Sequence, residues 1–273
     1  SYAFYNCESL TSVTMSDSVT SIGDYAFVGC SGLENMALSN NLTEIGMYAF
    51  KNCSALSGTI VIPDGVTEIG NQTFYGCKKL EGITLGTKVT SIGDSAFYGC
   101  TALESIKLPT TLSEIKQSAF YNCTALAGNI VLPSGITLIE KYTFYNCKNI
   151  TGVSIPNGVV SIGDSAFMYC NAIATLEIPD SVTTIGDSAF TADSQETQCL
   201  TSVTIGSGVT RIGQGAFANQ SNLGSATFAD TESVWYFYAS TQVVPNYDYT
   251  GGTEIGAMSA TDTAENATKL KST

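Results

Sequence analysis

The sequence predicts an α/β solenoid of about ten stacked coils, with a parallel β-sheet on one face and short strands with single helical turns on the other. Phenylalanine marks the repeat, at spacings of 23, 23, 24, 23, 23, 24, 23, 23 and 27 residues. Isoleucines from Ile22 to Ile212 and cysteines from Cys7 to Cys170 keep the same register. A fixed period of this length is the sequence signature of a repeat array. The ten phenylalanines are Phe4, Phe27, Phe50, Phe74, Phe97, Phe120, Phe144, Phe167, Phe190 and Phe217.

One unit of the repeat has three parts. Residues 103–109 alternate apolar and polar side chains and end at a proline, a pattern that predicts a strand followed by a turn. Residues 112–115 predict a shorter extended piece, and residues 119–123 a single helical turn. Aspartates precede this third part in several units and occupy the place of a helix N-cap. They are Asp24, Asp94, Asp164 and Asp187.

A coil of 23 residues cannot bury its apolar side chains alone, but stacked coils can, because the strand of each coil pairs with that of the next. A longer period is also present, since residues 54–123 resemble residues 124–190. Each of these blocks opens with a unit that is one residue longer. We interpret them as duplicated blocks of three coils, in which the extra residue forms a small bulge in the strand.

The repeat predicts three segments. Residues 1–227 form the solenoid, with a polar insertion at 191–198. Residues 228–258 depart from the repeat and predict a C-terminal cap that covers the last apolar coil. Residues 259–273 have little apolar content and predict a loosely ordered tail. The chain begins in the middle of a unit, which indicates a piece of a longer protein.

The composition limits the classes of function. The chain has 11 basic and 24 acidic residues and a formal net charge of −13, which disfavours nucleic-acid and anionic-membrane partners. It has no run of 18 apolar residues, so no direct membrane insertion is expected. Histidine is absent, which removes the usual general base and the commonest metal ligand. We therefore expect no enzyme activity, no cofactor and no metal.

The cysteines occupy one position in successive coils. A metal site of sulfur ligands needs converging side chains, and parallel neighbours in a stack do not converge. We interpret them as a ladder of small buried thiols that pack and bond to backbone groups, with disulfides as the alternative. Cys199 lies outside this register and is the thiol expected to be exposed. The ladder consists of Cys30, Cys53, Cys77, Cys100, Cys123, Cys147 and Cys170, with Cys7 at its start.

Two surfaces are candidates for binding. Tyrosines follow the repeat phenylalanine in several coils and can either cover the neighbouring coil or offer contact area to a protein, with packing the preferred reading. They are Tyr5, Tyr75, Tyr98, Tyr121 and Tyr145, with Met168 next in the row. Outward positions of the strands form the default binding face of a solenoid. They are Thr14, Ala37, Val61, Thr84, Lys107, Val131, Ser154, Glu177, Thr204 and Thr227.

Glutamates at equivalent positions of neighbouring coils raise a third possibility. Glu81 pairs with Glu104, and Glu44 with Glu68, at the spacing that two catalytic carboxylates of a glycosidase require. Duplication produces such pairs automatically, and nothing indicates a hollow around them. A carbohydrate-binding or carbohydrate-processing role is therefore only a second alternative.

The string L-x-x-I-x-L-P-x-x-V-T-x-I-G-x-x-A-F-x-x-C resembles the BspA-like leucine-rich repeat, also called the Treponema pallidum type. It is clearest in residues 80–100, 103–123 and 173–190, and the resemblance covers about residues 1–228. It implies a leucine-rich repeat fold in an extracellular or cell-surface protein that adheres to host matrix or plasma proteins, or to microbial surface proteins. A spacer or stalk within a larger surface protein is the first alternative. The ligand and the oligomeric state are not implied.

Overall fold

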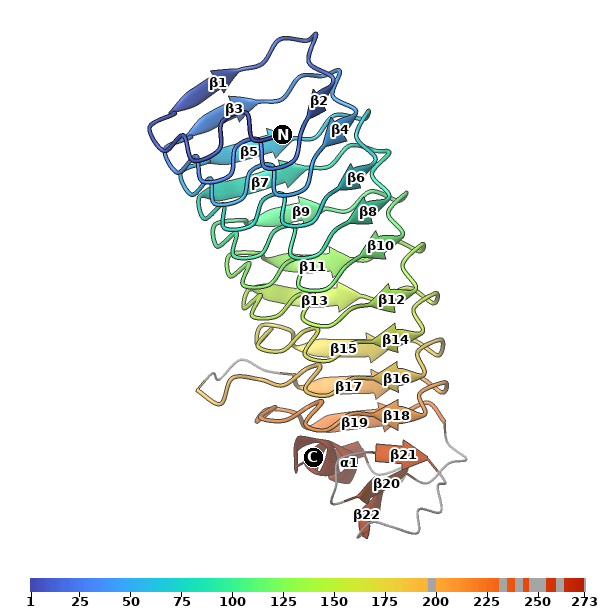
Figure 1. Cartoon of the computed structure of the whole chain (residues 1–273). Coiled ribbons are helices and arrows are strands. Elements are labelled where there is room, and N and C mark those ends of the chain that lie inside the picture. The colour runs from blue at the N-terminus through green and yellow to red at the C-terminus, as the bar shows by residue number, and fades with distance from the viewer. Residues whose placement is uncertain (196–199, 231–234, 239–242, 246–253, 259–262, 273) are drawn as a thin grey trace.

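The structure is a computed structural model that describes residues 1–195, 200–230, 235–238, 243–245, 254–258 and 263–272. Figure 1 shows an elongated stack of coils with the two termini at opposite ends. Each coil contributes one longer strand to one face and a two-residue strand to another, and a third, turn-forming segment closes the coil.

The longer strands define the first face, which we call the long-strand face. They are β1 (Ser12–Thr14), β3 (Asn35–Ala37), β5 (Gly58–Val61), β7 (Leu80–Thr84), β9 (Ser105–Lys107), β11 (Gly128–Val131), β13 (Ile150–Ser154), β15 (Thr175–Ile178), β17 (Ser202–Ile205) and β19 (Ser225–Phe228). Neighbours that pair along this face do so in parallel and with equivalent residues opposite each other, as in Val203 opposite Ala226.

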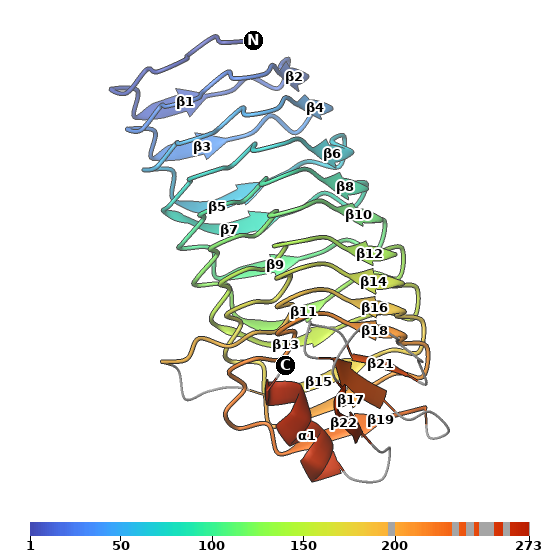
Figure 2. The same ribbon diagram turned by 60° about the horizontal axis from the view of Figure 1, so that its bottom comes forward.

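The two-residue strands form the short-strand face. They are β2 (Ser21–Ile22), β4 (Glu44–Ile45), β6 (Glu68–Ile69), β8 (Ser91–Ile92), β10 (Glu114–Ile115), β12 (Leu138–Ile139), β14 (Ser161–Ile162), β16 (Thr184–Ile185) and β18 (Arg211–Ile212). Figure 2 shows the two faces as separate rows of arrows. Nine strands here and ten on the other face make nine complete coils within the described residues, against the ten or so predicted.

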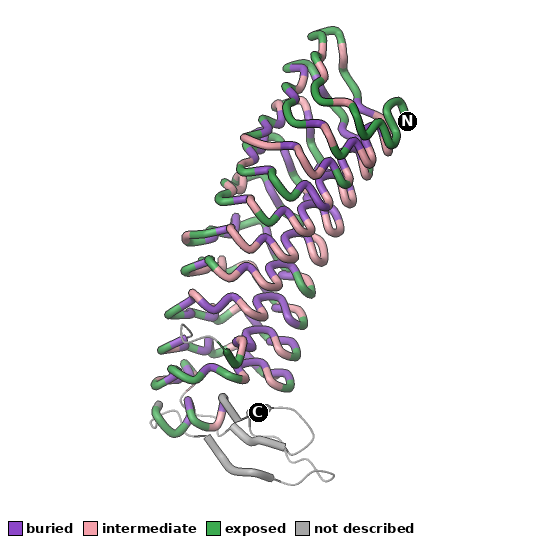
Figure 3. The backbone as a smooth tube through the Cα atoms, turned by 90° about the vertical axis from the view of Figure 1, so that its left-hand side faces the viewer, coloured by how far each residue is buried: buried purple, intermediate pink, exposed green. Residues whose placement is uncertain are grey.

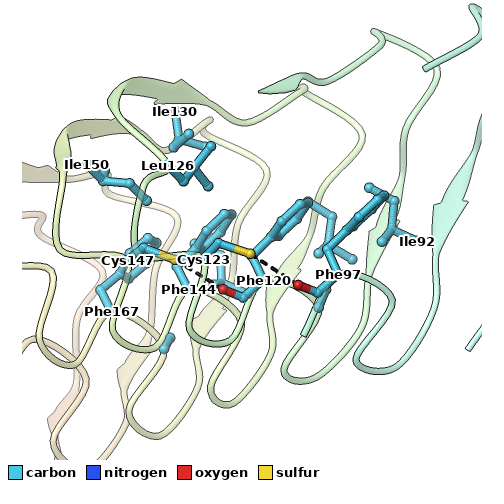
Figure 4. Close-up of a cluster of buried hydrophobic side chains, with 14 of the residues drawn as sticks. Ile92, Phe97, Phe120, Cys123, Leu126, Ile130, Phe144, Cys147, Ile150 and Phe167 are labelled. Carbon is cyan, nitrogen blue, oxygen red and sulfur yellow. Dashed lines mark hydrogen bonds between the residues drawn. The ribbon is translucent and has the colours of Figure 1, made fainter. Parts of the chain in front are cut away.

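The core is a set of ladders inside the stack, and from Ile22 onward burial follows the inner side of the coils (Figure 3). The repeat phenylalanines stack on one another with ring centroids 5.0–5.5 Å apart. Figure 4 shows Phe97, Phe120 and Phe144 in this stack, with Cys123 and Cys147 beside them. Because each ring lies between the rings of two neighbours, burial depends on stacking rather than on any single coil.

The predicted helical turn after each short strand is wrong. No described residue of 1–195 or 200–230 is helical, and the segment is a series of tight turns. The residues two before and two after the phenylalanine have positive φ, as at Tyr25 (57°) and Gly29 (71°). A right-handed helix cannot accommodate such left-handed residues. Alternate N–H groups instead donate to the next coil, as Phe27 does to the carbonyl of Ala49 at 2.8 Å.

The N-cap role of the aspartates is also wrong. The Asp24 carboxylate accepts a hydrogen bond of 2.7 Å from the N–H of Met47, which lies in the next coil. Asp164 and Asp187 likewise accept from the equivalent residue one coil further, at 2.9 Å. These carboxylates join coils at the corner where the turn segment begins. With no helix to cap, the nearest unsatisfied N–H belongs to the neighbouring coil.

Two joints interrupt both faces of the array. Among the described strands, β3 does not pair with β5 nor β4 with β6, and β9 does not pair with β11 nor β10 with β12. These joints precede the two units that carry the extra residue. Register shifts in the following pairings at Gly58 and Gly128, both with positive φ, agree with the predicted bulges. The long-strand face is also interrupted between β13 and β15.

The turn segments continue across both joints. Phe50 donates to the carbonyl of Thr73, and Phe120 to that of Thr143, each at 2.8 Å. Their phenylalanine rings also stack across the joints, with centroids 5.3 and 5.2 Å from those of Phe74 and Phe144. The strand ladders are therefore interrupted at the joints, while the turns continue across them and a backbone bond precedes each long strand, from Ser57 to Glu34 at 3.1 Å and from Ala127 to Glu104 at 3.0 Å.

The C-terminal part leaves the repeat. Strands β20 (Trp235–Tyr238), β21 (Val243–Pro245) and β22 (Glu254–Met258) are antiparallel, and β21 pairs with β18. Helix α1 (Thr263–Ser272) lies against β19 (Figure 2), with Ala267 and Leu270 fully buried. A helix thus occupies most of the predicted tail. Its few apolar residues share one face at i, i+3 spacing, which an average composition conceals.

Candidate functional site

The predicted outward row on the long-strand face is exposed at all ten positions. Where the strands pair, members of the row lie opposite one another, as Val61, Thr84 and Lys107 do on β5, β7 and β9. Glu177, Thr204 and Thr227 do the same on β15, β17 and β19. The row therefore forms a solvent-facing strip of small, mixed side chains along the array.

Two valines are the most exposed apolar residues of this strip. Val61 and Val131 have 60% and 61% of their surface accessible. They occupy equivalent positions in the strands that follow the two joints. The strip is thus mixed in chemistry but carries an apolar side chain in the long strand that follows each of the two joints.

Four of the predicted tyrosines form a continuous stack, which we call the tyrosine belt: Tyr75, Tyr98, Tyr121 and Tyr145. Their ring centroids are 4.7, 4.5 and 4.3 Å apart, with interplanar angles of 4–7°. All four are half-buried. Stacking covers the faces of the inner rings, so the belt offers ring edges and hydroxyls rather than flat faces to a ligand.

The hydroxyls of the belt are linked. Burial, and then the neighbouring phenols, raise the pKa of Tyr98, Tyr121 and Tyr145. Each phenol favours the neutral form of its neighbours, because two adjacent phenolates would repel each other.

Tyr5 does not join the belt, and a second stack replaces it near the N-terminus. Tyr2, Tyr25 and Tyr48 stack at 4.8 and 4.7 Å, two residues before the repeat phenylalanine. Lys51 connects the stacks, with its Nζ 5.3 Å from the Tyr48 ring centroid and 4.8 Å from that of Tyr75. The 23-residue spacing of Tyr2, Tyr25 and Tyr48 was the signal in the sequence that could have identified this second stack.

The cysteines of the ladder are buried, and each from Cys30 to Cys170 donates its thiol to a phenylalanine carbonyl of the preceding coil, at 2.9–3.2 Å. None of the eight described cysteines forms a disulfide. Cys7, at the start of the ladder, is exposed, so the prediction of a buried thiol is wrong there. Gln220 occupies the ladder position in the last complete coil, and its Nε2 donates to the carbonyl of Phe190 in the same way.

Burial governs the chemistry of these thiols. It raises the pKa of Cys53, Cys77, Cys100, Cys123 and Cys147 well above the ordinary value, and that of Cys170 to about 12. The thiolate is the reactive form of cysteine. The ladder is therefore unsuited to nucleophilic or redox chemistry in the folded protein.

With this geometry in place, comparison with known families is decisive. Residues 1–127 and 127–241 match the model of the BspA type leucine-rich repeat region of six copies. The chain belongs to this family. Among curated proteins, none matches the chain.

Solved structures of BspA-type and other leucine-rich repeat proteins resemble this array. A leucine-rich repeat protein from Bacteroides ovatus is 30% identical, with a TM-score of 0.58 over 78% of this chain and 60% of its own. The T. pallidum leucine-rich repeat protein is 27% identical, with a TM-score of 0.51 over 63% of this chain and 69% of its own. The pneumococcal vaccine antigen PcpA, at 20% identity and a TM-score of 0.50, shares the fold and covers 77% and 60% of the two chains. This chain spans 60% of the length of the Bacteroides protein.

The carboxylate pairs lie on the open surface of the BspA-type array. Glu81, Glu104, Glu44 and Glu68 are all exposed. Strands β4 and β6, which carry the second pair, do not pair with each other. Neither pair has the desolvated hollow in which a glycosidase holds its acid. Within the described part of the chain, no group of three cysteines or acids is arranged to hold a metal ion.

The irregular segment after Phe190 is described in part. Thr191 and Ala192 are buried, and Asp193 donates its N–H to the side chain of Asn171 at 3.1 Å. The rest of the predicted insertion and Cys199 lie outside the described residues. No described helix is long and apolar enough to cross a membrane.

Proposed function

We propose that this BspA-type array is a non-catalytic module of an extracellular or cell-surface protein and that it binds a protein ligand, from a host matrix or plasma or from a microbial surface. The observation that carries the proposal is the long-strand face, where ten outward side chains are exposed and none is used in the core. Membership of a leucine-rich repeat family supports a scaffold for protein interaction.

The character of the strip supports a protein ligand over a sugar. It presents small polar side chains around the exposed Val61 and Val131, and it has no aromatic ring lying flat to the solvent. Protein interfaces combine an apolar centre with a polar rim in this manner. The net charge of −13 further favours a ligand with basic groups.

The same type of substitution, valine to glutamate, made on two different faces of the array tests the proposal. Immobilised matrix and plasma proteins would be screened for saturable binding to the array, and then to Val131→Glu and Val160→Glu. Both valines are exposed, at 61% and 49%, but Val160 lies beside the short-strand face. We expect Val131→Glu to weaken binding at least tenfold and Val160→Glu to leave it unchanged. Absence of saturable binding to any protein, or equal effects of the two variants, would contradict the proposal.

A spacer role is the second candidate, and the elongated stack in Figure 1 favours it. An array that acts only as a stalk uses neither the strip nor the belt. A longer protein containing the array would then bind its ligand with the same affinity when Val131 is replaced by glutamate.

We also propose that β20–β22 and α1 close the C-terminal end of the array. Pairing of β21 with β18 and burial of Ala267 and Leu270 against the last coil support this assignment. Replacing Leu270 with aspartate should then lower the stability of the last coils first, as measured by hydrogen exchange.

A further inference from the structure

The second joint contains a groove in the surface of the short-strand face. It has a volume of about 340 Å³ and lies between β10 and β12. Six residues line it, three from each strand and its flanks: Ser113, Glu114, Ile115, Thr137, Leu138 and Glu140. The groove is where the short-strand face is interrupted.

Missing cross-coil hydrogen bonds account for the groove. In a paired coil, Thr90 donates to the Thr67 carbonyl and Gly93 to the Ile69 carbonyl, each at 2.8 Å. At the joint, the equivalent N–H groups of Thr137 and Glu140 make no such bonds to the carbonyls of Ser113 and Ile115, all of which are described residues. The carbonyls of this wall point toward the next coil and have no backbone partner there.

The β10 wall of the groove is an acceptor site, whereas the opposite wall carries Leu138 and the N–H groups of Thr137 and Glu140, which are donors. Two backbone carbonyls and the carboxylates of Glu114 and Glu140 supply oxygen atoms. Leu138 exposes 47% of its surface beside them, where other coils have a serine, threonine, glutamate or arginine. A ligand that fits the acceptor wall must offer several donors and a positive charge, and Leu138 gives contact area to an apolar stem.

We propose that this groove receives an arginine side chain of a protein partner. The guanidinium group has five N–H donors, no acceptor and a permanent charge, and its methylene stem can pack on Leu138. Charge-assisted bonds to carboxylates are the stronger class of hydrogen bond. The inference rests on the proposed function, because it names the partner chemistry that one part of the array selects.

Lys116 lies beside the groove and forms a salt bridge with Glu114. Its Nζ lies 3.8 Å from Glu114 Oε2, and both side chains are exposed. An exposed pair at that distance is weak and yields readily to a bidentate partner. Glu114 is therefore accessible to an incoming guanidinium group.

The first joint supplies a matched control. Glu44 and Glu68 occupy the positions of Glu114 and Leu138, and Gly70 that of Glu140. That joint has two carboxylates but no apolar wall. Neutralising Glu44 and Glu68 changes the net charge as much as neutralising Glu114 and Glu140 does.

The test titrates the ¹⁵N-labelled array with the peptide acetyl-Gly-Arg-Gly-amide and, separately, with its citrulline analogue. We expect saturable amide shifts confined to residues 113–116 and 137–140, with a Kd of about 1 mM. Glu114→Gln/Glu140→Gln should weaken binding at least fivefold, and Leu138→Ser about twofold to fivefold. Glu44→Gln/Glu68→Gln should leave the Kd within a factor of two.

Three results would overturn the proposal: no saturable shift at these amides, equal binding of the citrulline peptide, or an equal loss in the first-joint control. The Leu138→Ser variant is expected to fold normally, because serine occupies the equivalent position in the coils of Ser91 and Ser161. A loss of binding in this variant therefore reports on the groove and not on misfolding. If the arginine peptide binds here while the screen finds no protein ligand, the proposed function is contradicted but the arginine site in the groove is supported. If proteins bind but Glu114→Gln/Glu140→Gln has no effect on the peptide, the groove proposal alone fails.

Discussion

The thiol of Cys123 donates a 3.1 Å hydrogen bond to the carbonyl oxygen of Phe97 in the preceding coil (Figure 4). That carbonyl also accepts the N–H of Cys100 at 3.1 Å. Each cysteine thus fills a small buried space and joins two coils. Gln220 makes the same type of bond to Phe190, which shows that the position requires a donor rather than sulfur.

We expect Cys123→Ala to lower the free energy of unfolding by about 1–3 kcal/mol, because it removes both the hydrogen bond and buried atoms. Urea unfolding followed by circular dichroism measures the change. Cys7→Ala is the control, since Cys7 is exposed and should change stability by less than about 0.5 kcal/mol. Equal effects of the two substitutions would contradict a structural role for the ladder.

Alkaline pH should destabilise the array well before the tyrosines titrate. Burial raises the pKa of the ladder thiols in the folded state, whereas in the unfolded chain a thiol has a pKa of about 8.5. Above that pH the unfolded state releases protons that the folded state retains, so stability falls as pH rises, by up to about 1.4 kcal/mol per unit for each thiol. Urea midpoints between pH 7 and 9.5 should show this decline. The slope should be smaller in Cys77→Ala/Cys100→Ala, and an unchanged slope would argue against protonated ladder thiols.

Substitutions at Tyr121 separate packing from binding in the tyrosine belt. Tyr121→Ala removes two stacked contacts and should cost about 2–3 kcal/mol of stability. Tyr121→Phe keeps the rings stacked and should cost less than about 1 kcal/mol. Thermal unfolding measures both. If Tyr121→Phe preserved stability but abolished binding of a protein ligand, the belt would be an interface and not only a cover for the coils.

Hydrogen exchange should reveal the joints. The amides of Thr137 and Glu140 have no cross-coil acceptor, whereas the equivalent Thr90 and Gly93 do. We expect the first two to exchange about tenfold faster or more. The corresponding amides of the first joint, Thr67 and Gly70, should behave as Thr137 and Glu140 do. Uniform protection along the short-strand face would show that the coils stack without joints.

Much of this fold could be predicted, because each coil of the repeat has the same residue types at the same positions. The phenylalanine period gave the coils, the alternation in residues 103–109 gave the long strand, and the extra residue before Ile60 gave the bulge. The left-handed turn positions were missed because Asp24 and its equivalents imitate an N-cap. Asparagine or glycine two residues after phenylalanine, as at Asn52 and Gly76, was the signal that could have corrected this.

The candidate site was less predictable than the fold. The outward row follows from strand alternation alone, and its exposure could be assigned residue by residue. The groove could not, because it depends on two hydrogen bonds that are absent between Ser113 and Thr137 and between Ile115 and Glu140. No particular residue type in the sequence indicates that such a hydrogen bond is absent. Helix α1 was likewise hidden, because Ala267 and Leu270 are the only buried apolar residues among its described side chains.

The joints also imply how the array would respond to force. Tension along the stack is carried by the turn segments, whose bonds continue across both joints, as at Phe50 and Phe120. The strand faces carry little of that load where their ladders are interrupted, since at each joint the long-strand side has a backbone bond only just before the strand, from Ser57 to Glu34 and from Ala127 to Glu104. A pulling experiment would therefore extend the protein in steps that begin at the joints, each releasing a block of coils. Such a rod would lengthen stepwise under load and so limit the force transmitted to any domain attached to it.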